Sequence, residues 1–179
     1  GKKWSVENRS VFDLSPAQDG SFDIVHSWGV LHHTGDMDGA LKSAAALVAP
    51  GGLFVIALYR KTPLCDLWRI EKKIYTEAPA PLQIALRSVY KAIYMLGLLA
   101  TRRNPMTYIS EYKSNRGMNW DHDVHDWLGG YPYESVTPDE VEAFMKAQGF
   151  EMVRSNTKAA NVGGLLGTHC DEFVARRMR

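Results

Sequence analysis

The sequence predicts an α/β fold, and three consecutive segments lead to that prediction. Residues 22–28 are rich in β-branched and aromatic side chains, which is typical of a short strand. Apolar residues at three- and four-residue spacing then predict a helix, at Met37, Leu41, Ala44 and Val48. Residues 53–59 run without a polar break, as in a strand that is covered on both faces. A strand, a helix and a buried strand over about forty residues form one βαβ unit.

Charged and turn-forming residues mark the ends of the predicted helix. Asp36 and Asp38 lie near its start, where carboxylates complement the positive end of the helix dipole. We expect Pro50-Gly51-Gly52 to end the helix and to precede the second strand.

The C-terminal part of the chain predicts one helix followed by two strands. Thr137-Pro138-Asp139-Glu140 is a capping box with proline at the first helical position, and Gly149 suits a left-handed cap at the helix end. The strands are expected at 150–155 and 172–176, joined by a connection that contains Gly163, Gly164 and Gly167. Because no helix separates these strands, an antiparallel pairing is favoured.

Two segments between these parts have a different composition. Residues 63–101 predict a helical insertion with an apolar stripe, formed by Leu86, Val89, Tyr90, Ile93, Tyr94 and Leu98. The stripe is shorter than the roughly 20 residues that span a bilayer. Two interpretations stay open: an amphipathic helix that covers the core, or contact with a membrane surface or a lipid-linked substrate. Residues 108–134 are aromatic and polar with few aliphatic side chains, so we expect a loop or short-helix region over a site.

Composition excludes several classes of protein. With 179 residues, 45% hydrophobic and 23% charged, the chain suits one soluble globular domain. Lys and Arg total 21 and Asp and Glu total 20, a balance that argues against a dedicated binder of nucleic acid or anionic membranes. The two cysteines, Cys65 and Cys170, are too few for a disulfide framework, so a cytoplasmic, reducing environment is expected.

Two motifs together resemble a known family. FDIVHSWGVLHH at 22–33 and LVAPGGLFVI at 47–56 resemble the second half of class I S-adenosylmethionine-dependent methyltransferases. The RGMNWDHD and DWLGGYPYE segments are similar to a bacterial subgroup of these enzymes. The resemblance implies a Rossmann-like sheet whose last strand is inserted antiparallel, S-adenosyl-L-methionine as cofactor, and a small-molecule, sugar or lipid-like methyl acceptor.

The resemblance also implies a cofactor site at the carboxyl end of residues 22–28. Ser27, Trp28 and Gly29 leave this strand where the family places cofactor-contacting main chain. By position, Ser10 and Val11 approach the adenine, with Asp13 as a substitute for the acidic residue that the family often has at position 10.

Catalytic and substrate residues follow from the same resemblance. His32 and His33 are candidates for the catalytic base, with loop packing as the alternative. The substrate pocket is expected in the aromatic region, at Trp120, His122, Tyr131, Tyr133 and Glu134. His122 and His125 have a weak metal-ligand spacing without a remote third ligand, so we expect no metal.

The family's main cofactor anchor is a glycine-rich loop after the first strand, followed by an acidic residue at the end of the second. Neither occurs in this sequence. We therefore expect residues 1–179 to be a partial methyltransferase domain, the C-terminal part of a longer enzyme, with weak or absent cofactor binding by itself. Two alternatives are a non-catalytic remnant of the fold that acts as an interaction module, and a nicotinamide-dependent oxidoreductase.

Overall fold

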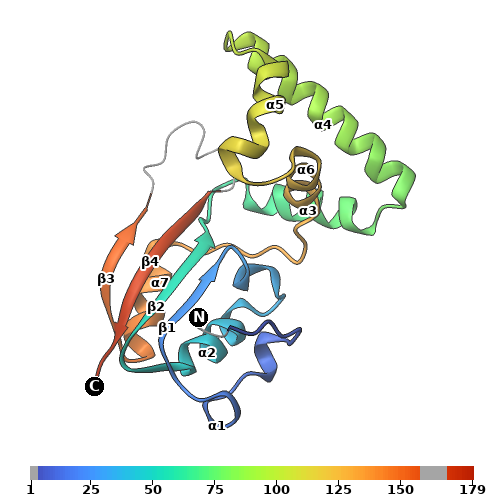
Figure 1. Ribbon diagram of the computed structural model, residues 1–179. Coiled ribbons are helices and arrows are strands. Elements are labelled where there is room, and N and C mark those ends of the chain that lie inside the picture. The colour runs from blue at the N-terminus through green and yellow to red at the C-terminus, as the bar shows by residue number, and fades with distance from the viewer. Residues whose placement is uncertain (1–3, 158–168) are drawn as a thin grey trace. The chain divides into compact units, whose positions relative to one another are not determined.

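The structure is a computed structural model that describes residues 4–157 and 169–179. The chain divides into two compact units (Figure 1). The sheet unit comprises residues 1–65 and 133–179, and the helical unit comprises residues 66–132. The three late glycines, Gly163, Gly164 and Gly167, lie outside the described residues.

The sheet unit contains a four-stranded sheet with the order β1-β2-β4-β3 (Figure 1). Its strands are β1 (Phe22–Trp28), β2 (Val48–Tyr59), β3 (Phe150–Asn156) and β4 (Cys170–Arg177). β1 pairs with β2 in parallel, whereas β4 is antiparallel to both β2 and β3. The α/β fold and the antiparallel pairing of the last two strands are therefore confirmed.

Helices pack on one face of this sheet. They are α2 (Met37–Ala46) and α7 (Pro138–Ala147), with the shorter η1 (Val11–Asp13), α1 (Pro16–Asp19) and η2 (Leu31–His33) along the N-terminal part. The core under α2 and α7 is aliphatic and aromatic, with buried Leu41, Phe54, Ile56, Met145, Phe150 and Phe173 among its members. The opposite face of the sheet is exposed at Ile24 and Trp28. The hydrophobic core of the sheet unit therefore lies on the face that α2 and α7 cover.

The boundary between α2 and β2 differs from the expectation. The helix ends at Ala46, and Pro50-Gly51-Gly52 lies inside β2 instead of between the two elements. Gly51 has a φ of +81°, and a Cβ on Gly52 would lie 2.9 Å from the carbonyl oxygen of Asp23 in β1. The two glycines therefore permit a close strand approach where the β1–β2 register shifts.

A basic side chain from the last strand caps α2. Arg177 donates hydrogen bonds from Nη1 to the carbonyl oxygens of Ala45 (3.2 Å), Ala46 (3.3 Å) and Val48 (3.0 Å). Carbonyl oxygens at the C-terminal end of a helix carry partial negative charge, so a cation at this end is stabilising.

The capping box of α7 forms as predicted. Thr137 Oγ1 accepts a hydrogen bond from the Glu140 amide at 3.2 Å, and Glu140 Oε2 accepts one from the Thr137 amide at 2.8 Å. Hydrogen bonds from Thr137 hold the pKa of Glu140 below its ordinary value. Gly149 ends the element with a φ of +77°.

The helical unit is built from α3 (Cys65–Glu77), α4 (Ala80–Ala100), α5 (Pro105–Arg116) and α6 (Trp120–Gly129). The expected loop or short-helix region is therefore mostly two regular helices. Asn104 and Asn119 cap α5 and α6 by accepting main-chain hydrogen bonds. An aromatic cluster joins α4, α5 and α6, with Tyr90, Tyr94, Tyr108, Tyr112, Trp120 and Trp127 among its members.

Candidate functional site

β1 is parallel to β2, and β3 runs in the same direction because both β2 and β3 are antiparallel to β4. The carboxyl ends of β1, β2 and β3 therefore lie at one edge of the sheet. In open α/β sheets, this edge is where ligands bind. The loop that follows β1 and the residues after β2 both leave the sheet here. This carboxyl edge is the candidate site.

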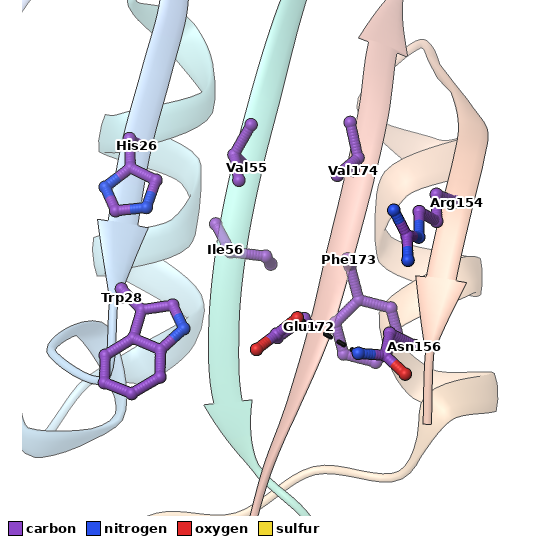
Figure 2. Close-up of a pocket in the computed structure, with 9 residues that line it drawn as sticks. All are labelled: His26, Trp28, Val55, Ile56, Arg154, Asn156, Glu172, Phe173 and Val174. Atoms are coloured by element: carbon purple, nitrogen blue, oxygen red, sulfur yellow. Dashed lines mark hydrogen bonds between the residues drawn. The ribbon is translucent and has the colours of Figure 1, made fainter. Parts of the chain in front are cut away.

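A cavity of about 300 Å³ lies on the exposed face of the sheet near this edge. His26 and Trp28 line it from β1, and Arg154 and Asn156 line it from β3 on the opposite side (Figure 2). Asn156 donates a hydrogen bond of 3.1 Å to Glu172 on β4. The walls therefore combine an indole with charged and amide groups, which suits a ligand with both flat apolar and polar parts.

The end of β1 leaves both an aromatic ring and main chain accessible. Trp28 is 59% exposed. Gly29 has a φ of +74° with no atom within 4 Å of the position that a Cβ would take. Its amide donates a hydrogen bond of 3.1 Å to the carbonyl oxygen of Ala57, which fixes the turn. Ser27 is half-buried and alternates to the other face of the strand from Trp28.

The two histidines after β1 differ in environment. His32 is fully buried, and among the described residues neither of its ring nitrogens has a hydrogen-bond partner. Its ring lies 4.4 Å from that of His33 and 4.0 Å from that of Tyr59, measured between centroids. Burial, with a smaller contribution from His33, lowers the pKa of His32 to about 3. His32 is therefore a weaker proton acceptor than an ordinary histidine, whereas His33 is half-buried. A catalytic role for either histidine stays a prediction.

Glu134 holds this loop in place. Its main-chain amide donates to the carbonyl oxygen of His32 at 3.0 Å. Its Oε2 accepts a hydrogen bond of 2.9 Å from the amide of Met37, at the start of α2. A carboxylate at a helix N-terminus is stabilised by the helix dipole. The described contacts thus make Glu134 a residue that positions the histidine loop.

Tyr133 contacts Cys65, to which no sequence motif connects it, and lies next to Tyr59, whose ring contacts both histidines. Tyr133 is buried, its ring centroid lies 5.4 Å from that of Tyr59, and its hydroxyl donates to Cys65 Sγ at 3.3 Å. Burial and the bond to Cys65 raise the pKa of Tyr133. Burial alone would raise the pKa of the Cys65 thiol, but hydrogen bonds from Ser135, Thr62 and Tyr133 lower it below its ordinary value. The sequence offered no signal for this contact, because 68 positions separate the two residues.

The remaining residues of the predicted substrate pocket belong to the helical unit. Trp120 is buried in the aromatic cluster, whereas His122 and Tyr131 are exposed. Tyr133 and Glu134 belong to the sheet unit. That these five predicted residues line one substrate pocket stays a prediction.

The residues predicted near the adenine are grouped at η1. Ser10 caps this turn, since its Oγ accepts a hydrogen bond of 3.3 Å from the Phe12 amide. Val11 packs against the core, and Asp13 is exposed. Within the described residues, no group of three or more His, Cys, Asp or Glu side chains could hold a metal ion.

Comparison with known families identifies one family for most of the chain. Residues 3–155 match the family described as methyltransferase domain. A ubiquinone biosynthesis O-methyltransferase from Bordetella avium is 26% identical over 129 residues, which cover 64% of this chain and 54% of the relative. An uncharacterized protein from Synechococcus is 35% identical over 82 residues, 46% of this chain and 18% of the relative.

A solved structure has a similar fold. PKMT2 from Rickettsia typhi, in complex with AdoHcy, superposes with a TM-score of 0.55 and 11% identity, over 94% of this chain and 38% of that one. The chain therefore spans about half, or less, of the length of the proteins that it matches.

Proposed function

The chain belongs to the methyltransferase domain family, and from this premise we propose that it takes part in methyl transfer from S-adenosylmethionine to a small-molecule, sugar or lipid-like acceptor. The observation that carries the proposal is the end of β1, where the exposed indole of Trp28 adjoins the open main chain of Gly29 at the carboxyl edge of the sheet.

The residues at this edge fit a nucleoside-containing cofactor. Trp28 offers a flat apolar wall, and Gly29 allows main chain to approach a ligand closely because nothing fills the space beside it. When bound, S-adenosylmethionine supplies an electrophilic methyl group on a sulfonium. The chain's own residues then have to position the acceptor and to remove its proton.

We assign the proton transfer to His33. Its ring is half-buried and lies edge-on to Tyr59, with centroids 5.2 Å apart, so its orientation is restrained while one side stays accessible. A neutral imidazole nitrogen can accept the proton from a hydroxyl that is being methylated. His32 and Glu134 act through His33 by fixing the loop, and they do not touch the acceptor in this proposal.

The similarity to the ubiquinone biosynthesis O-methyltransferase from Bordetella avium supports an oxygen acceptor on a quinone-like or other lipid-like molecule. A cytoplasmic location and the absence of a nucleic-acid partner are part of the same proposal, based on the low cysteine content and the balanced charge of the chain. The glycine-rich loop outside residues 1–179 stays a prediction, so the test uses the full-length protein beside residues 1–179.

Titration with S-adenosylhomocysteine by isothermal calorimetry tests this function. We expect the full-length protein to bind, Trp28→Ala to bind about tenfold more weakly through loss of stacking, and Trp4→Ala to bind like the wild type. Trp4 is the matched control because it is also exposed. Absence of binding heat would favour the non-catalytic remnant, and heat with NAD instead would favour an oxidoreductase. Equal affinity of the two variants would contradict the role of Trp28.

A further inference from the structure

Helix α4 has one face inside the helical unit and one face outside it. Tyr90, Tyr94 and Leu98 lie on the inner face, where α5 and α6 run along the same side of the helix (Figure 1). The Tyr94 hydroxyl contacts that of Tyr108 at 2.9 Å, and Lys91 forms an ion pair with Asp121. The outer face is exposed and apolar, with Leu82, Leu86, Val89, Ile93, Leu96 and Leu99.

This outer face carries no charge along the whole helix. The only charged residues in α4 are Arg87 and Lys91. They precede Tyr94 and Leu98 at three- and four-residue spacing, so they lie on the inner side of the helix. Exposed positions between the large apolar residues are Ala85, Ser88, Ala92 and Gly97. A solvated helix face is normally polar. A continuous apolar face along a helix of 21 residues, about 32 Å long, therefore indicates a contact surface.

Two other roles for α4, crossing a membrane and pairing with a second copy, fit the structure less well. In the described part of the chain, α4 is the one helix long and apolar enough to cross a membrane, and only 6% of its most apolar window is buried. Crossing would remove Tyr94 and Lys91 from their partners on α5 and α6. A coiled coil with a second copy would use Leu82, Leu86, Val89, Ile93 and Leu96 as its seam. The flanking positions that specify such pairing by charge are uncharged here.

The end of the helix carries cations. Arg102 and Arg103 follow the C-cap residue of α4, Thr101. Both arginines are exposed, and no ion pair is found for either among the described residues. Met106 is exposed two positions into the next helix. A wide apolar face with cations at its border is the pattern of a helix that lies in the headgroup region of a bilayer.

We propose that the outer face of α4 is a membrane-contact surface, with the helix lying in the plane of a bilayer and Arg102 and Arg103 against lipid phosphates. Apolar burial supplies most of the affinity, which is consistent with the balanced charge of the whole chain. The inference does not depend on the proposed methyl transfer, because vesicle binding is measured without cofactor or acceptor.

Vesicle flotation of residues 1–179 tests the surface. We expect binding to phosphatidylcholine vesicles, and tighter binding when phosphatidylserine is added at about a 7:3 ratio. Val89→Glu is expected to weaken partitioning by about tenfold or more, because a carboxylate enters the apolar face. Val6→Glu is the matched control, because Val6 is also an exposed valine but lies in the sheet unit, and this variant is expected to bind like the wild type. Arg102→Gln with Arg103→Gln is expected to remove most of the preference for phosphatidylserine.

Three results would overturn the proposal. They are no flotation of the wild type, equal flotation of Val89→Glu and wild type, or a dimer in sedimentation velocity that Val89→Glu dissociates. Far-UV circular dichroism melting checks that each variant folds. If Val89→Glu melts earlier, the milder Leu96→Gln gives the same comparison, with weakened flotation expected.

Discussion

Acidification is expected to destabilise the sheet unit through His32. This side chain is fully buried, neither ring nitrogen has a hydrogen-bond partner in the described residues, and its pKa is lowered to about 3 from an ordinary value of 6.5. A histidine with a depressed pKa in the folded state is protonated first in the unfolded chain. The contribution of the neutral His32 ring to the free energy of unfolding is therefore fully present above pH 6.5 and is lost as the pH falls towards 3.

The magnitude follows from the two pKa values. At pH 5 the unfolded chain has already gained the proton and the folded chain has not. The free energy of unfolding is therefore expected to be about 2 kcal/mol lower at pH 5 than at pH 8. At pH 5 most carboxylates are still ionised, which isolates the contribution of the buried imidazole.

Urea unfolding followed by far-UV circular dichroism at both pH values measures this loss. His32→Phe removes the titrating ring and is expected to remove about 2 kcal/mol of the pH dependence. His26→Phe, at an exposed position of β1, is expected to keep it. Equal pH dependence of the wild type and His32→Phe would show that His32 does not cause the loss of stability. An NMR titration of the His32 ring gives the same answer without substitution, because its shifts should not move between pH 8 and pH 5.

Two further substitutions test the packing of the sheet unit. Gly52→Ala places a Cβ 2.9 Å from the carbonyl oxygen of Asp23, so calorimetry is expected to show a loss of about 1–3 kcal/mol; Gly97→Ala, with open space around it, should match or exceed the wild type. A melting temperature unchanged by Gly52→Ala would show that the strands tolerate separation. Asp171→Asn breaks the ion pair with Arg60, whose Nε lies 2.7 Å from Oδ2. Because Asp171 is buried, denaturant unfolding should show a loss of about 3 kcal/mol, and a loss below 1 kcal/mol would contradict this role of the pair.

Local signals in the sequence were sufficient for much of the sheet unit. β1 occupies the predicted residues 22–28, because its β-branched run is bounded by Gly20 and Gly29. The capping box at Thr137 and the left-handed Gly149 likewise act through neighbouring residues alone. The antiparallel end of the sheet followed from the absence of a helix pattern between its strands.

Features that depend on distant contacts were not predictable. Pro50-Gly51-Gly52 has a turn composition, but its place inside β2 depends on the close approach of Gly52 to Asp23. In α4 the predicted stripe combined two faces, since periodicity cannot show that Tyr90 meets other helices while Val89 and Ile93 stay exposed. The aromatic cluster combines rings from three helices, so the low aliphatic content of residues 108–134 did not prevent a core.

The histidine loop shows the same limit at the site. His32 and His33 are identical side chains with adjacent positions, and the sequence assigned them one role. The structure separates them because Tyr59 and Glu134, from other elements, enclose the first and leave the second half-exposed. Burial, and with it the pKa, is a property of the packed chain.

In the proposed function, the carboxyl end of β1 contacts the methyl donor. Ultraviolet cross-linking of methyl-labelled S-adenosylmethionine to the full-length protein, followed by mass spectrometry of the labelled peptides, tests it most directly. We expect a label on the peptide that contains Trp28 and Gly29, and we expect excess S-adenosylhomocysteine to suppress it. A label confined to other peptides, or labelling that the competitor does not suppress, would contradict it.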